Sequence, residues 1–231
     1  MPDVGNDPSA EHTSGATLEY AALSSGLTRY LESVEMFFPY AAAQLSLRQH
    51  AEHAAGADVY FEEELDSERA QLQDELLGVV PRAIRGSALV VLFSAFESTV
   101  MDFSKELSSE LELPPFDPSS KKGTLLEKAN RYYSDTCGVQ LFSSPVEKRG
   151  IEILRRLRNS FVHKQSTFLA LPEEIQASII ARKNRLTNCQ VHGHFWVPNM
   201  GCVRAHGELV HTWAHSLCGR VVHRVGPEAY L

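Results

Sequence analysis

The chain has 231 residues, of which 43% are hydrophobic and 22% charged, and its formal net charge is −7 at pH 7. These proportions are ordinary for a globular domain and exclude wholesale disorder. The acidic balance argues against broad, non-specific binding of nucleic acid, so any such contact must use a local basic patch.

The first residues predict a flexible tail without a targeting signal. Residues 1–16 are rich in small and polar residues and hold almost no large apolar side chain, which favours a mobile terminus. They lack the basic start and apolar stretch of a secretory signal. The most apolar run, Ala88–Phe96, is far shorter than the roughly 20 residues that span a bilayer. We therefore expect a soluble cytoplasmic protein without membrane contact, whose four cysteines are reduced.

Two helical segments are expected before residue 82. Apolar residues recur at helical spacing from Leu18 to about Ala55, which predicts one long helix with a bend near Pro39. A second helical block begins near Tyr60 with a run of acidic residues, which suits a helix N-terminus. Pro81 should break or kink this block, because proline lacks an amide donor and clashes with the preceding turn.

The most deeply buried helix is expected from about Ala83 to Leu111. Between Ala88 and Phe96 this segment is apolar nearly all round, which is typical of a helix buried on most sides. The prolines and small polar residues of Leu113–Gly123 predict a loop. A short helix is expected over Thr124–Ser134.

The C-terminal part predicts further helices and one hairpin. Ser144 is a plausible N-cap, with Pro145 at the first helical position, for a helix that runs through SSPVEKRGIEILRRLRNSFVHKQ. Another short helix is expected over 171–183. Residues 189–197 alternate enough to form a strand or hairpin, and a last helix is expected from about Arg204 to His223.

The residues that carry chemistry lie near the end of the helix that follows Pro145. Asn159 and His163 are four residues apart and share one helical face, so Asn159 can hydrogen-bond the imidazole and fix its tautomer. Arg158 has a planar guanidinium that suits a phosphate. Such a set can cleave a phosphodiester without metal, because histidine moves the proton and arginine neutralises transition-state charge. The alternative is structural, since Arg and His favour the last helical turn through the helix dipole.

The segment LRNSFVHKQ, residues 157–165, resembles the Arg-Asn-x-x-x-His motif of the HEPN superfamily (higher eukaryote and prokaryote nucleotide-binding domains). Upstream, ALVVLFSAFESTVMDF resembles the family's earlier core helix, in which an apolar run leads to a glutamate, here Glu97. The resemblance covers roughly residues 60–164. It implies an all-α, HEPN-like helical bundle with long antiparallel helices, one domain over residues 17–231, to which the pattern near residues 188–197 adds a small β-hairpin.

The resemblance also implies a homodimer that pairs through the motif helices. Active members resemble metal-independent endoribonucleases with a composite site in the dimer cleft. Carried over, Arg158 would bind phosphate, Asn159 would orient His163, and His163 would act as general acid or base. Glu97 would be a supporting polar residue. The structural alternative for Glu97 is a buried carboxylate paired with one of the arginines at positions 155, 156 and 158.

The expected function is a metal-independent endoribonuclease that leaves 2′,3′-cyclic phosphate ends on its RNA substrate. It would serve as a toxin or phage-defence effector, with an antitoxin or another regulatory partner. The alternative is a catalytically inactive HEPN dimer that binds a nucleotide or a partner protein. No cofactor is expected. The chain holds neither a phosphate-binding GxxxxGK[ST] loop nor a GxGxxG stretch, which argues against an autonomous NTPase.

Two other groups of residues have both a functional and a structural interpretation. His211 and His215 have the spacing that places two imidazoles on one helical face, but no known zinc-finger spacing fits the region, so packing is favoured and no metal is expected. The histidines and cysteines concerned are Cys189, His192, His194, Cys202, His206, His211, His215 and Cys218. Basic residues could line an RNA path, although most surface charges are merely solvated; they are Arg82, Arg85, Lys121, Lys122, Lys148, Arg149, Arg155, Arg156 and Lys164.

Overall fold

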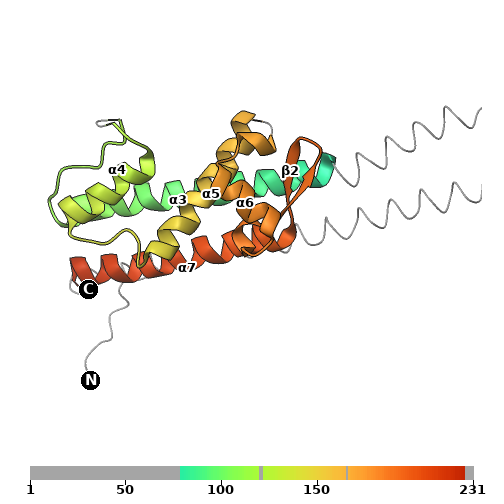
Figure 1. Ribbon diagram of the computed structural model, residues 1–231. Helices are drawn as coiled ribbons and strands as arrows, with labels where there is room; N and C mark the ends of the chain where they lie inside the picture. Colours follow the sequence, from blue (N-terminus) through green and yellow to red (C-terminus); the bar gives the residue numbers. More distant parts are fainter. Residues whose placement is uncertain (1–78, 120–121, 165, 227–231) are drawn as a thin grey trace, which may run out of the picture.

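The computed structural model describes residues 79–119, 122–164 and 166–226, and this part of the chain is mostly α-helical (Figure 1). The expected tail, the long helix expected over 18–55 and most of the second helical block lie outside it. The helices are α3 (Val80–Glu110), α4 (Leu125–Arg131), the π-helix η3 (Tyr132–Cys137), α5 (Pro145–Lys164), the 3-10 helix η4 (Phe168–Ala170), α6 (Glu173–Ala181), the 3-10 helix η5 (Arg185–Thr187) and α7 (Met200–Val225). The strands are β1 (Cys189–His192) and β2 (Phe195–Pro198).

Helix α3 is the longest element of the described chain and begins where proline is tolerated. Pro81 is one of the first two residues of α3, positions at which proline is common. The apolar run Ala88–Phe96 is only partly covered, because Val91 stays 51% exposed on the face opposite the core. By length and composition alone α3 could cross a membrane, with mean hydropathy 1.4 over an 18-residue window that is 44% buried. A core helix passes the same test, and α3 packs as one here.

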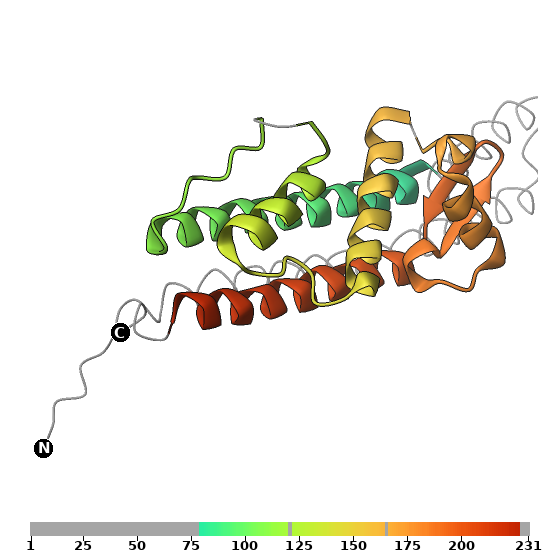
Figure 2. The ribbon, with the colours of Figure 1, turned by 60° about the vertical axis from the view of Figure 1, so that its left-hand side comes forward.

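The core lies between α3 and α7, which run side by side in the same direction (Figures 1 and 2). The Phe96 and Trp213 rings meet at the middle of the two helices, with centroids 4.5 Å apart. Arg85, near the start of α3, donates to the Pro198 carbonyl just before α7. The expectation of antiparallel long helices is therefore wrong for this pair. The reason is topological: α4 and α5 carry the chain back before α7 begins.

Helix α5 stands steeply across α3 and α7 (Figure 2), and two glycines permit the close approach. A Cβ on Gly86 of α3 would lie 2.0 Å from the ring of Phe161, and one on Gly150 of α5 would lie 2.7 Å from the Leu209 side chain. The predicted start of α5 is confirmed. Ser144 Oγ accepts a hydrogen bond from the Glu147 amide, and the helix begins at Pro145.

The predicted hairpin is confirmed, with β1 and β2 antiparallel and Cys189 opposite Pro198. Trp196 ties it to α5 by donating from Nε1 to Ser160 Oγ over 2.9 Å. Helix α7 begins earlier than the expected Arg204, because the Asn199 side chain accepts from the Cys202 amide and caps the helix there. The short helices expected over 124–134 and 171–183 are also present, as α4 with η3 and as α6.

Candidate functional site

The candidate motif occupies the last two turns of the most basic element of the described chain. Helix α5 carries six Lys or Arg residues and two Glu residues, although the whole protein has a net charge of −7. Its apolar residues, such as Ile151, Leu154 and Leu157, are fully buried. Of the basic residues, Lys148, Arg149 and Lys164 are exposed, whereas Arg155, Arg156 and Arg158 are partly buried.

Arg158 is half-buried between α5 and α3. Its Nη1 donates to Oδ1 of Asn159 over 2.9 Å, and its Cζ lies 5.6 Å from the centroid of the Phe93 ring, within reach of a cation–π interaction. Its Nε is buried and has no hydrogen-bond partner among the described residues. Asn159 and the Phe93 ring thus hold the guanidinium in place, and its buried Nε–H group is left without an acceptor among the described residues.

Glu97 comes from α3 and interacts with the same arginine. Burial raises the pKa of Glu97 above its ordinary value, and the charge of Arg158 opposes that rise. The other two arginines proposed as partners are engaged elsewhere. Arg155 donates to both Glu152 oxygens at 2.8 and 2.6 Å, and Arg156 donates to Glu152 Oε1 at 2.8 Å. Of the three candidates, Arg158 is the one that faces Glu97.

His163 is exposed in the last turn of α5. Within the part of the chain that the structure describes, no hydrogen bond links it to Asn159, whose Oδ1 accepts from Arg158 instead. Asn159 therefore orients the arginine in this single chain, whereas the expectation was that it orients the histidine. In the folded chain Arg158 and Asn159 are hydrogen-bonded to each other, and among the described residues His163 has no hydrogen bond to either.

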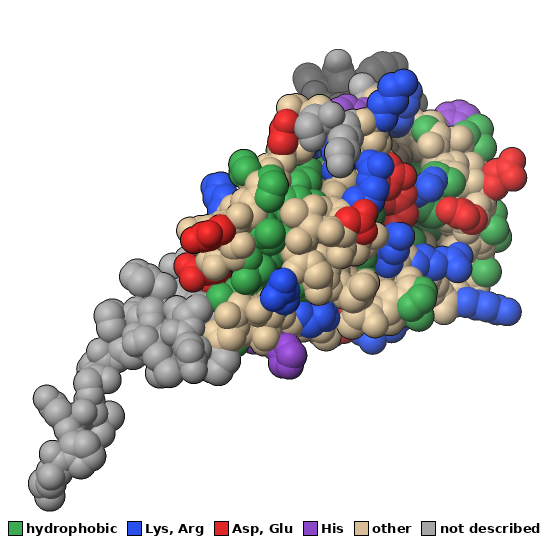
Figure 3. All heavy atoms as spheres, turned by 90° about the vertical axis from the view of Figure 1, so that its left-hand side faces the viewer, with side chains coloured by type: hydrophobic (Ala, Val, Ile, Leu, Met, Phe, Trp, Pro, Cys, Tyr) green, Lys and Arg blue, Asp and Glu red, His purple; other side chains and the backbone are tan. Residues whose placement is uncertain are grey.

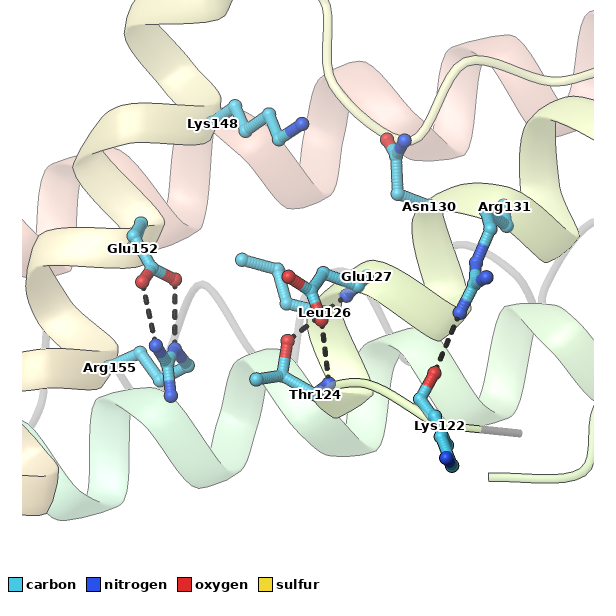
Figure 4. A pocket seen from close by; sticks show the side chains of 9 residues that line it. All are labelled: Lys122, Thr124, Leu126, Glu127, Asn130, Arg131, Lys148, Glu152 and Arg155. Carbon is cyan, nitrogen blue, oxygen red and sulfur yellow. Dashed lines mark hydrogen bonds and ion pairs between the residues drawn. The ribbon is translucent and has the colours of Figure 1, made fainter. Parts of the chain in front are cut away.

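A groove of about 500 Å³ opens between α4 and α5, next to the motif (Figure 4). Glu152 and Arg155 form one wall from α5, and Figure 4 shows Lys148 reaching from the same helix toward α4. On the other wall Arg131 donates to the Lys122 carbonyl over 3.0 Å. The groove is lined by Lys122, Thr124, Leu126, Glu127, Asn130, Arg131, Lys148, Glu152 and Arg155.

The sequence alone did not indicate what α4 contributes to this groove. The available signal was the pair Thr124 and Glu127, whose side chains cap each other's amides and start α4. That signal predicts where α4 starts but not that α4 lies across a groove from α5. On the face of the molecule at the α4 end, basic and acidic side chains lie close together (Figure 3).

The proposed basic residues divide among separate places and do not line one cleft. Lys122, Lys148 and Arg155 line the groove. A smaller cavity, about 50 Å³, has Arg149 and Arg156 in its wall. At the hairpin end, Arg82 lies 4.6 Å from the Phe195 ring centroid and Arg85 donates to the Pro198 carbonyl. Lys164 is exposed at the end of α5, and Lys121 is outside the described residues.

The histidines and cysteines are spread over the hairpin and α7. No group of three or more His, Cys, Asp or Glu residues in the described ranges is arranged to hold a metal ion. Cys202 and His206 are buried and both donate to the Leu186 carbonyl, over 3.2 and 2.9 Å. The His211 and His215 rings contact each other edge to face, with centroids 4.5 Å apart. Cys202 and His206 therefore have a visible structural role in fastening η5 to α7.

The buried histidine predicts a stability loss in mild acid. Burial lowers the pKa of His206 to about 4. Below pH 6.5 the imidazole is therefore protonated in the unfolded chain but stays neutral in the folded chain. Stability from this group is present at neutral pH and is lost as pH falls from 6.5 toward 4, by about 2 kcal/mol between pH 7 and pH 5. Urea titrations at both pH values should show this loss, and His206→Gln, which keeps a donor for Leu186, should show a correspondingly smaller one. Equal losses in the two proteins would contradict the assignment.

No protein-family model matches this sequence, and no curated protein or solved structure is significantly similar to the chain. Membership of the HEPN superfamily, which the two motifs predict, therefore stays a prediction. The case for a function rests on the geometry of α3 and α5.

Proposed function

We propose that the protein is a metal-independent endoribonuclease of the HEPN type, whose centre forms where two copies bring their α5 ends together. The observation that carries the proposal is the arrangement of the motif in one chain. Arg158 is fixed by Asn159 beside Glu97, whereas His163 is exposed and has no hydrogen bond to that pair among the described residues. A second copy related by a two-fold axis could supply the missing half, since such interfaces are self-complementary.

The chemistry uses only the side chains of the motif. His163 would accept the proton of a ribose 2′-hydroxyl, and the freed oxygen would attack the adjacent phosphorus. The bond from phosphorus to the 5′-oxygen would break, that oxygen would take up a proton, and a 2′,3′-cyclic phosphate would remain. Arg158, half-buried next to Asn159, would neutralise charge on the phosphate in the transition state.

The second candidate is a catalytically silent HEPN dimer that binds a nucleotide or a partner protein. The observation in its favour is that Arg158 already has partners, namely Asn159, the Phe93 ring and the charge of Glu97. An arginine held in this way can serve the fold alone. The ribonuclease is preferred because one mechanism then uses Arg158, Asn159 and His163 together, whereas the structural interpretation explains the exposed His163 separately, by the helix dipole.

Chelation tests the ribonuclease directly. Because Arg158 and His163 suffice for charge and proton transfer, cleavage of single-stranded RNA should proceed unchanged in EDTA, with His163→Ala as the inactive control. Products should carry 2′,3′-cyclic phosphate ends. Activity that disappears in EDTA and returns with zinc would instead assign the chemistry to a metal. Several RNAs left intact by the wild-type protein would favour the binding module.

Under this proposal the protein works in the cytoplasm as a toxin or phage-defence effector. A nuclease of that kind must be inhibited until it is needed, so an antitoxin or another regulatory protein is the expected partner. These statements follow from the proposed activity and fall with it.

A further inference from the structure

We infer that the groove between α4 and α5 binds the phosphodiester backbone of single-stranded RNA and leads the strand to Arg158 and His163. The inference rests on the proposed ribonuclease function and extends it by giving the substrate a path. It commits to contacts with backbone phosphates, made chiefly by Lys148 of α5 and Arg131 of α4.

The groove and the motif share one face of α5. Lys148, Glu152, Arg155, Asn159 and His163 follow each other at spacings of three or four residues, so their side chains line up along the helix. Lys148 and His163 are exposed, and Glu152, Arg155 and Asn159 are half-buried. With a rise of 1.5 Å per residue, Lys148 and His163 are about 22 Å apart along the axis. A strand lying on this face would thus contact both, with more than one nucleotide between them.

The charge of the groove favours an anion although the protein as a whole is acidic. Four cationic side chains, at positions 122, 131, 148 and 155, face two carboxylates there. Both carboxylates already accept hydrogen bonds from other residues. Glu152 binds Arg155 and Arg156, and Glu127 accepts from the Thr124 amide. Lys148 is exposed and has no ion-pair partner within the described ranges. Its ammonium is therefore available to a phosphate.

The lining also indicates which part of the RNA is contacted. It offers lysine and arginine side chains, Asn130 and Thr124, but no aromatic ring on which a base could stack. Contacts of this kind fix the position of a strand without reading its sequence. We therefore expect the groove to add affinity that depends on salt and not on base identity.

Binding can be tested separately from cleavage. In the full chain carrying His163→Ala, which should slow cleavage enough for binding to be measured, affinity for a labelled single-stranded oligoribonucleotide is determined by fluorescence anisotropy over a range of salt. Lys148→Glu should weaken binding several-fold and lower the slope of log K against log salt by about 0.7, the value for one lost single-strand phosphate contact. The matched control is Lys183→Glu, an exposed lysine outside the groove, which should leave the slope unchanged.

Cleavage gives a second readout in the protein with His163 intact. Lys148→Glu should raise KM for a long RNA with little change in kcat, and should leave cleavage of a dinucleotide, which reaches only the motif, as in the wild type. If Lys148→Glu and Lys183→Glu change binding and KM equally, the proposal that RNA binds in the groove is wrong, while the proposed cleavage activity is unaffected. Groove-dependent binding without any cleavage by the wild type would overturn the ribonuclease and keep the groove. Absence of RNA binding would overturn both.

Discussion

Replacing His163 with alanine should slow RNA cleavage by about 10²–10⁴-fold, the usual cost of losing a general acid–base group. The side chain is exposed at the end of α5, so its removal leaves no cavity and the thermal unfolding midpoint should stay close to that of the wild type. Single-turnover rates with a labelled RNA measure the effect. A variant that folds normally and cleaves as fast as the wild type would remove the histidine from the mechanism.

Arg158→Ala should cost a similar factor through lost electrostatic stabilisation, but this residue needs a stricter control. Arg158 is half-buried opposite Glu97, and its removal leaves that carboxylate without its cation, which destabilises the fold. The double variant Glu97→Gln with Arg158→Ala removes the orphaned charge. We expect it to recover stability and to stay inactive. Recovery of both stability and cleavage would show that Arg158 serves the fold only.

Local signals in the sequence predicted the ends of several elements correctly. Ser144 followed by Pro145 marks the start of α5, and the hairpin was found from its alternating pattern. Helix α7 starts before the predicted Arg204 because the Asn199 side chain caps it. The direction of α3 relative to α7 was wrong for a different reason: helix direction depends on how the intervening chain crosses the core, which periodicity does not encode.

The same distinction holds for the candidate site. Neighbours on one helix could be read from spacing, as with Arg155 and Arg156, which lie three and four residues after Glu152 and bind it. Contacts between different helices cannot be predicted from spacing along the sequence. The charge of Arg158 acts on Glu97, and Phe161 lies against Gly86, because α5 crosses α3. The groove exists because α4 and α5 face each other across it. Such contacts need the crossing geometry, which one sequence does not specify.

The most direct test of a shared centre mixes the two inactive variants. After subunit exchange, a heterodimer of Arg158→Ala and His163→Ala still has one Arg158 and one His163, on different copies. If they work across the interface, one centre in each heterodimer is intact, and cleavage should return to about a quarter of the wild-type rate at full random exchange. Mass spectrometry confirms that heterodimers form. Heterodimers that form and stay inactive would contradict a centre built from Arg158 of one copy and His163 of the other.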